Sequence, residues 1–384
     1  MSEMPCPKYS TLAFPVLQEG EDMLIKDAGT VAVVTLPGSF NYGNMLQKSA
    51  VQYHLKKRGF EPMTFEFVDL SLRKKLSTLY WRVFRGAESS REKSMSNERR
   101  RRFNDFRSNL SVGILNSIDM SALDGFDVYV SGSDQVWNPS YIDRFRSTFL
   151  PFAPAERRVA LSASFGVEEL PVERVAEFER AIGGFAHISV REEAGANIVE
   201  SLTGRRPLVL CDPTLAVSRA EWEHIADDSL NPVGPYMFAY LLGEDNAWRA
   251  GLLRDLAARL GVDIVRISDR DSKGQLPAGP AEFIALIADA RYVVTDSFHC
   301  ALFAAMFERP LTIVRRNHAE PSMFSRLETL SSKLGLEGKI VGEGGEPDLN
   351  AAAEYSDLKQ RVDTERAAFD AYLDEALCRN AIHK

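Results

Sequence analysis

The chain has 384 residues, of which 45% are hydrophobic and 26% are charged, a composition typical of globular proteins and too apolar for wholesale disorder. Its formal net charge of −8 argues against a general nucleic-acid binder, so we expect no nucleic-acid partner. At about 150 residues per domain, the length predicts two or three domains.

After an N-terminal extension, residues 1–29, the first half of the chain alternates two kinds of pattern. Short β-branched runs predict strands at residues 31–36, 63–68, 127–130, 158–162, 187–190 and 207–210. Amphipathic stretches predict helices at residues 45–57, 172–182 and 193–202. This alternation indicates a mostly parallel sheet, and we expect one Rossmann-like domain over residues 30–227.

A basic segment interrupts this domain. Residues 72–107 contain twelve Lys or Arg against four Asp or Glu, a net charge of +8. One interpretation is a helical insertion with solvated basic faces, since charge runs usually lie in water. The other is a patch that contacts an anionic acceptor or an anionic membrane surface.

The second half repeats the α/β alternation. Residues 227–235 read as a linker, because they contain the turn-forming pairs Asn231-Pro232 and Gly234-Pro235. Strands are predicted at 236–241, 263–267, 292–295 and 311–314, and helices at 246–260, 281–288, 300–307 and 323–334. We therefore expect a second Rossmann-like domain, residues 235–345, facing the first across a cleft in a GT-B-like α/β arrangement. A C-terminal helix (residues 351–377, in the segment 350–384) is expected to close it.

Two motifs in the first domain follow predicted strands, where parallel α/β sheets bind ligands. Residues 36–47 (LPGSFNYGNMLQ) form a glycine-bracketed turn that can hold an anion or a sugar hydroxyl, with candidates Asn41, Tyr42, Gly43, Asn44 and Gln47. Residues 131–139 (SGSDQVWNP) combine polar groups with a ring suited to carbohydrate, with candidates Ser133, Asp134, Gln135, Trp137 and Asn138. The alternatives are glycines needed by any tight turn and a loop capped by Asp134.

In the second domain, residues 295–300 (TDSFHC) follow a strand and place Asp296, Ser297 and His299 at its carboxyl end. Histidine is suited to proton transfer near neutral pH, although a histidine beside an apolar helix is often structural. Guanidinium groups that suit a small phosphorylated acid are Arg191, Arg315, Arg316 and Arg326. Surface salt bridging is the alternative for one of Arg315 and Arg316, and Asp212-Pro213 reads as a strand-ending turn.

Several of these segments, in this order, resemble the polysaccharide pyruvyl transferase family. They are residues 39–47, 131–139, 150–152 (LPF), 189–195 (SVREEAG), 211–215 (CDPTL), 295–311 (TDSFHCALFAAMFERPL) and 324–336 (FSRLETLSSKLGL). The resemblance covers residues 30–340. It implies a GT-B-like fold and transfer of pyruvate from phosphoenolpyruvate, as a ketal, onto a sugar of an exopolysaccharide or cell-surface glycan precursor. It also implies that His299 is the general acid/base and Arg191 an anion ligand.

We expect His299 to protonate the donor and Asp134 or Asp296 to orient or deprotonate the acceptor, with no metal or cofactor. The alternatives are a GT-B glycosyltransferase that uses a nucleotide sugar and a non-catalytic sugar-binding subunit. The four cysteines have no metal-site spacing and no signal peptide is recognisable, so we expect a cytoplasmic protein. Residues 72–107 would dock a lipid-linked oligosaccharide at the inner membrane face. The oligomeric state stays open.

Overall fold

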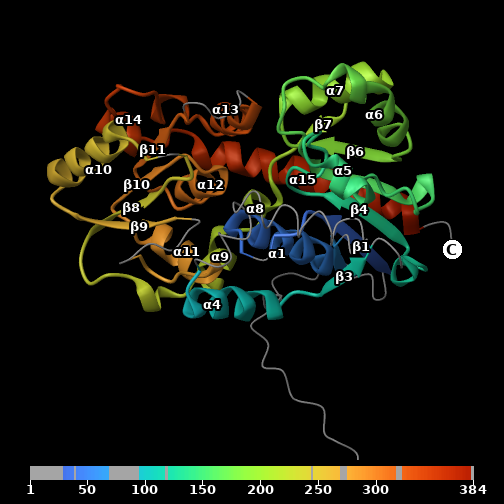
Figure 1. The fold of residues 1–384 in the computed structure, drawn as a ribbon, viewed down its shortest axis with the longest axis horizontal. Helices are drawn as coiled ribbons and strands as arrows, with labels where there is room; N and C mark the ends of the chain where they lie inside the picture. The colour runs from blue at the N-terminus through green and yellow to red at the C-terminus, as the bar shows by residue number, and fades with distance from the viewer. Residues whose placement is uncertain are drawn as a thin grey trace, which may run out of the picture.

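The computed structural model describes residues 29–38, 40–68, 95–116, 120–243, 245–268, 275–316 and 322–381. Within these residues the strands form two sheets, and every strand pair is parallel (Figure 1). Helices connect successive strands in both sheets. The predicted fold class, two Rossmann-like α/β domains in a GT-B-like arrangement, is therefore confirmed.

The first sheet has seven strands: β1 Thr30–Thr35, β2 Glu61–Val68, β3 Val112–Asn116, β4 Val128–Gly132, β5 Arg158–Ala163, β6 His187–Val190 and β7 Leu208–Val209. Their spatial order is β3-β2-β1-β4-β5-β6-β7. Its helices are α1 Tyr42–Lys57, α4 Asn97–Ser108, α5 Ile142–Phe145, α6 Val175–Ile182, α7 Glu193–Thr203, α8 Pro213–Ala216 and α9 Arg219–Ile225. The edge strand β3 was not predicted, because its sequence VGILN is short and contains a glycine.

The second sheet has five strands: β8 Tyr236–Tyr240, β9 Asp263–Ile267, β10 Tyr292–Thr295, β11 Leu311–Val314 and β12 Ile340–Val341, in the order β12-β11-β10-β8-β9. Its helices are α10 Ala247–Leu260, α11 Pro280–Ala288, α12 Phe298–Met306, α13 Ser322–Leu334 and α14 Leu349–Ala353. Short 3₁₀ helices in the chain are η1 Ser121–Leu123, η2 Arg146–Phe149, η3 Ala155–Arg157, η4 Val172–Arg174, η5 Asp228–Leu230 and η6 Glu337–Lys339.

Helix α12 is buried along its whole length. Its sequence, FHCALFAAM, is apolar on every side, a pattern that places a helix in the interior rather than on a surface. One hydrophobic cluster contains its side chains together with side chains from both sheets, so the two domains share a continuous core. Among the described helices, none combines the length and the apolarity that crossing a bilayer requires.

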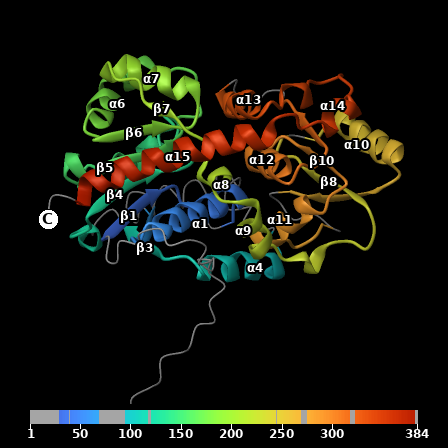
Figure 2. The ribbon, with the colours of Figure 1, turned by 180° about the vertical axis from the view of Figure 1, so that it is seen from behind.

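The C-terminal helix of the structure is α15, Leu358–Ala381, which lies across both domains (Figures 1 and 2). The predicted helix over 351–377 is interrupted between α14 and α15, where Asp357 has a φ of 56°. From the second domain α15 returns to the first, where the Tyr372 hydroxyl donates to the Ala160 carbonyl at 2.7 Å. Its closing position therefore rests on contacts with the first sheet.

Only the end of the predicted basic segment falls in the described residues, since residues 69–94 lie outside them. That end is α4, and two of its arginines face inward. The Arg99 guanidinium lies 5.2 Å from the centre of the Tyr42 ring and is almost fully buried. Arg102 forms an ion pair with Glu282 of the second domain. On α4, Arg99 and Arg102 therefore join the two domains, whereas Arg101 is exposed, as a solvated basic face requires.

Candidate functional site

Helices α1 and α12 meet at their N-terminal turns, at the carboxyl ends of β1 and β10. His299 lies in the first turn of α12 and is 8% exposed. Its Nδ1 approaches Gly43, in the first turn of α1, so closely that a Cβ on Gly43 would lie 2.1 Å from it. A glycine is therefore required where the first domain packs against this imidazole.

Asp212 is the carboxylate nearest to the imidazole. Its Oδ2 lies 3.6 Å from His299 Nε2 and 2.6 Å from Arg191 Nη1, and its Oδ1 accepts from the Thr214 backbone and hydroxyl. Burial opposes ionisation of Asp212, but His299, Arg191 and the Thr214 bonds hold its pKa well below the usual range. The sequence analysis assigned Asp212 only to a turn. The position of Asp212 directly after a predicted strand was the sequence signal for a site residue. Its partner, His299, belongs to the other domain, so the local sequence did not indicate the pair.

Arg191 and Arg326 form a pair of guanidinium groups over one aromatic ring. Their Cζ atoms lie 4.8 and 6.0 Å from the centre of the Phe298 ring. Asp134 Oδ1 lies 3.4 Å from Arg191 Nη2 and 3.8 Å from Arg326 Nη1. Although burial opposes it, these two arginines lower the pKa of Asp134.

The two arginines are neutralised to different degrees. Burial opposes the charge of Arg191, but Asp212 and Asp134 raise its pKa. Within the described residues, Arg326 has one ion pair, the contact of 3.8 Å between its Nη1 and Asp134 Oδ1. Burial together with neighbouring Arg191 lowers the pKa of Arg326 to about 10. A buried cation with so little compensation favours an incoming anion.

The Asp296 carboxylate is held by several hydrogen bonds within the second domain. It accepts hydrogen bonds from the Leu242 and Gly243 backbones and from Arg249, and Arg316 donates to the Asp296 carbonyl oxygen at 2.9 Å. These bonds commit Asp296 to anchoring the loop after β8. The carboxylate beside His299 is Asp212 instead. The prediction that Asp296 orients or deprotonates the acceptor gains no support from this geometry, because its oxygens already accept several hydrogen bonds.

Of the two remaining predicted arginines, one lies near the site and the other lies on the surface. Arg316 is largely buried beside Asp296, 3.3 Å from its Oδ2, and stays near the site. Arg315 is half-exposed and pairs with Glu328 at 2.7 Å, which matches the alternative of a surface salt bridge. Arg249, which the sequence analysis did not single out, is buried against Asp296 because α10 begins just after the loop that Asp296 anchors.

Most candidates on α1 support the fold around the site. Asn41 caps the helix by accepting from the Asn44 backbone, and the Asn44 amide donates to a backbone carbonyl of the preceding loop. The Tyr42 ring stacks on Phe283 of the second domain, 4.4 Å between ring centres. Gln47 is fully buried and accepts from the Ser133 backbone. Of these residues, Gly43 is the one in direct contact with His299.

The loop 131–139 contributes Asp134 to the site and buries most of its other candidates. Trp137 is fully buried among Phe149, Phe165 and Phe185, so its ring does not face a ligand, contrary to the sugar-stacking prediction. Ser133 is buried too, as are Gln135 and Asn138. Among the residues that the structure describes, the Gln135 Nε2 has no hydrogen-bond partner, and neither does Oε2 of the buried Glu192.

Ser297 precedes α12 as its N-cap residue, and its backbone N–H donates to the Thr295 hydroxyl at 3.0 Å. Within the described ranges, no group of three His, Cys, Asp or Glu side chains is placed to hold a metal ion.

The fold brings five side chains together into one cluster: Asp134, Arg191, Asp212, His299 and Arg326. Gly43 lies against the imidazole of this cluster.

The family model for polysaccharide pyruvyl transferase matches residues 41–318. The chain belongs to this family. Four residues of the cluster lie within the matched range, and Arg326 lies just beyond it. A search of curated proteins gave no significant match.

Solved structures with a similar fold are distant in sequence. A putative UDP-N-acetylglucosamine 2-epimerase from Listeria monocytogenes has 9% identity and a TM-score of 0.49, covering 92% of this chain and 91% of its own. The Neisseria meningitidis UDP-GlcNAc 2-epimerase has 10% identity and a TM-score of 0.41, with coverages of 91% and 99%. A Rickettsia africae glycosyltransferase has 12% identity and a TM-score of 0.39, with coverages of 92% and 93%.

Proposed function

We propose that this member of the family transfers pyruvate from phosphoenolpyruvate to two hydroxyls of a saccharide, forming a ketal and inorganic phosphate. The observation that carries the proposal is the guanidinium pair of Arg191 and Arg326 over Phe298, next to the His299–Asp212 pair. The first pair suits a small dianionic donor, and the second suits proton transfer.

Phosphoenolpyruvate carries a carboxylate and a phosphate, which require fixed cations. Arg191 and Arg326 both face Asp134, whose side chain is 20% exposed and is the most accessible acid of the cluster. A donor anion would take over one or both guanidinium groups from this carboxylate. Asp134 would then be free to accept a proton from an acceptor hydroxyl.

The reaction requires one proton donor and one proton acceptor. In the proposed sequence, His299 gives its proton to the donor methylene, which becomes a methyl group, while a sugar hydroxyl bonds to the neighbouring carbon and loses its proton to Asp134. The carbon–oxygen bond to phosphate then breaks, and the departing phosphate takes the proton from Asp134. The second hydroxyl attacks the same carbon and gives its proton to the neutral His299 imidazole, which restores the starting state. Asp212 Oδ2 lies 3.6 Å from His299 Nε2, beyond hydrogen-bond distance, and offers an opposite charge to the protonated imidazole.

The acceptor in this proposal is a sugar of an exopolysaccharide or cell-surface glycan precursor, free or lipid-linked, on the cytoplasmic side. The family match supports a hydroxyl-rich acceptor, as do two polar atoms, Gln135 Nε2 and Glu192 Oε2, that have no partner within the described part of the chain. These buried atoms need a donor and an acceptor group, which a hydroxyl provides.

The test is a donor screen on the purified full chain. Phosphoenolpyruvate labelled in the pyruvyl carbons is incubated with a panel of saccharide and lipid-linked acceptors, and phosphate release and label transfer are measured together. We expect both to occur in equal amounts and to fall at least 100-fold in His299→Gln. Transfer from nucleotide sugars instead, no turnover with any donor, or an undiminished His299→Gln variant would refute the proposal.

A further inference from the structure

Glu192 follows Arg191 directly and is the N-cap residue of α7, but within the described chain its side chain makes no capping hydrogen bond. The side chain is fully buried and faces the loop after β5 instead. Its Oε1 accepts hydrogen bonds from the Phe165 N–H at 2.7 Å, the Gly166 N–H at 3.2 Å and the Ser164 hydroxyl at 3.1 Å. One carboxylate oxygen therefore holds three consecutive residues of this loop.

The loop that Glu192 holds is bonded in turn to the loop that carries Asp134. The Ser164 N–H donates to the Asp134 carbonyl at 3.0 Å, and the Trp137 N–H donates to the Ser164 carbonyl at 3.2 Å. Backbone hydrogen bonds therefore join the two loops in both directions. Because of these bonds, a displacement of Ser164 would also displace the backbone of Asp134.

Asp134 has a backbone conformation that requires support of this kind. Its φ of 69° lies in the left-handed region, which residues other than glycine rarely occupy. Such a conformation persists only when the surrounding structure holds it. The Asp134 carbonyl accepts one bond from within its own loop, from the Val136 N–H at 2.8 Å, and one from outside, from Ser164. The outside bond depends on the loop that Glu192 fixes.

Glu192 also acts on the guanidinium pair through its charge. Burial and neighbouring Arg191 lower the pKa of Arg326 to about 10, and Asp134 and Glu192 oppose that shift. The charge of Glu192 therefore affects Arg326 directly, whereas its Oε1 reaches Asp134 through the loop. The two effects are separable, because a glutamine side chain keeps an oxygen that accepts hydrogen bonds but has no charge.

We propose that Glu192 is a positioning residue: by fixing the loop after β5, it holds Asp134 where this carboxylate can accept a proton from the acceptor hydroxyl. The proton transfer is part of the proposed function, on which this inference rests. The position rests on the hydrogen bonds from the loop to Glu192 and from Ser164 to Asp134. Loss of the Glu192 oxygen should displace Asp134, and a misplacement of about 1 Å at a catalytic group lowers turnover on the order of 100-fold.

The first test compares Glu192→Ala with Glu192→Gln by phosphate release from phosphoenolpyruvate, using the full chain and a saccharide acceptor. Glu192→Ala removes the oxygen that holds the loop, so kcat should fall at least 30-fold. Phosphoenolpyruvate should bind no more weakly, since Arg191 and Arg326 remain. Glu192→Gln should recover at least tenfold of the lost kcat. An equal loss of kcat in both variants would assign the effect to the charge and overturn the proposal.

A double-mutant cycle tests whether Glu192 acts through Asp134. In an Asp134→Asn background the positioned carboxylate is gone, so Glu192→Ala should lower kcat by less than a further threefold. A loss by the same factor in both backgrounds would show that Glu192 acts by another route, which overturns the proposal.

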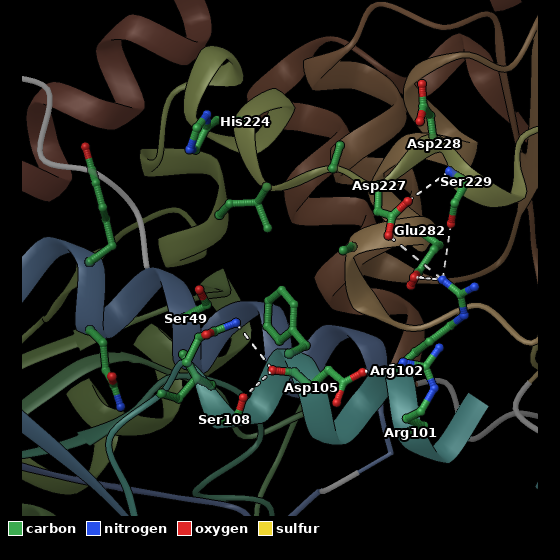
Figure 3. Close-up of a pocket in the computed structure, with 18 of the residues that line it drawn as sticks. Ser49, Arg101, Arg102, Asp105, Ser108, His224, Asp227, Asp228, Ser229 and Glu282 are labelled. Carbon is green, nitrogen blue, oxygen red and sulfur yellow. Dashed lines mark hydrogen bonds and ion pairs between the residues drawn. The ribbon is translucent and has the colours of Figure 1, made fainter. Parts of the chain in front are cut away.

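Glu282→Ala is the matched control. Glu282 is buried like Glu192 and accepts a hydrogen bond from the Gly279 N–H at 2.8 Å. Figure 3 shows it beside Arg102, on the wall of a cavity that residues of the cluster do not line. This variant should lose stability but keep kcat within twofold. A fall in kcat equal to that of Glu192→Ala would reduce the effect to general destabilisation and overturn the proposal.

Hydrogen exchange measures the position of the loops without any substrate. In Glu192→Ala, the backbone amides of Ser164 and Trp137 should exchange at least tenfold faster than in the wild type, and in Glu192→Gln they should not. Unchanged exchange at both amides in Glu192→Ala would overturn the proposal at any level of turnover. If the wild type transfers nothing from phosphoenolpyruvate, the proposed function fails, and the exchange rates still decide whether Glu192 holds the Asp134 loop.

Discussion

Substitution of Gly43 by Ala tests the contact between the two domains at the imidazole. The new Cβ would lie 2.1 Å from His299 Nδ1, whereas ordinary contacts begin at 3.4 Å, so the ring or the helix must move by about 1.3 Å. Overpacking of this kind costs about 1–3 kcal/mol. Replacing a helical glycine by alanine returns roughly 1 kcal/mol. The net loss of unfolding free energy is therefore up to about 2 kcal/mol.

The displacement should affect catalysis more than stability. A misplacement of about 1 Å at a catalytic group lowers turnover on the order of 100-fold. The assay is steady-state phosphate release, with stability measured by urea denaturation. Gly251→Ala is the control, because Gly251 also lies within a helix and has open space where the Cβ would be. That variant should gain about 0.5–1 kcal/mol and keep full activity.

A double-mutant cycle provides the decisive outcome. In a His299→Ala background the obstruction is gone, so Gly43→Ala should change from destabilising to stabilising by roughly 1 kcal/mol. If Gly43→Ala destabilises the His299→Ala protein as much as the wild type, the cost does not come from the imidazole. Full turnover in Gly43→Ala alone would show that His299 does not need its present position. Either result refutes the reasoning.

Three further predictions concern individual side chains. Folding lowers the pKa of Asp212, so the stabilisation from its ionised form should be present above about pH 3.9 and lost as the pH falls. Asp212→Asn should therefore flatten the acid limb of the stability–pH curve and reduce turnover at least tenfold. An unchanged acid limb would contradict the pairing of Asp212 with its basic neighbours. Arg326→Met should weaken phosphoenolpyruvate binding about 10–100-fold without lowering the melting temperature, because it removes a poorly compensated buried charge; unchanged affinity in calorimetry would exclude Arg326 from the donor site. Trp137→Phe should lower the unfolding free energy by about 1–3 kcal/mol and leave the acceptor KM unchanged, whereas a raised KM at unchanged stability would restore the sugar-stacking interpretation.

Features that depend on residues close together along the chain, such as strands and motifs, could be predicted from the sequence. Apolar runs such as 31–36 and 292–295 are strands because a parallel sheet buries both faces, and the motif order was sufficient to indicate the family. His299, Arg191 and Asp134 could be singled out as candidates because each follows a predicted strand, and the structure places them close together. The same local logic missed β3, whose five residues carry no distinctive pattern.

The tertiary structure decided which of these side chains lie together. Asp212 and His299 are 87 positions apart and in different domains, and packing of α12 against α8 and α1 brings them to 3.6 Å. Trp137 and Asp296 have the residue types expected of a sugar and proton-transfer site, yet an aromatic cluster encloses one and backbone donors occupy the other. A sequence records which groups a chain carries and the local pattern around them, whereas burial and pairing depend on contacts between distant segments, which exist only once both domains have folded together.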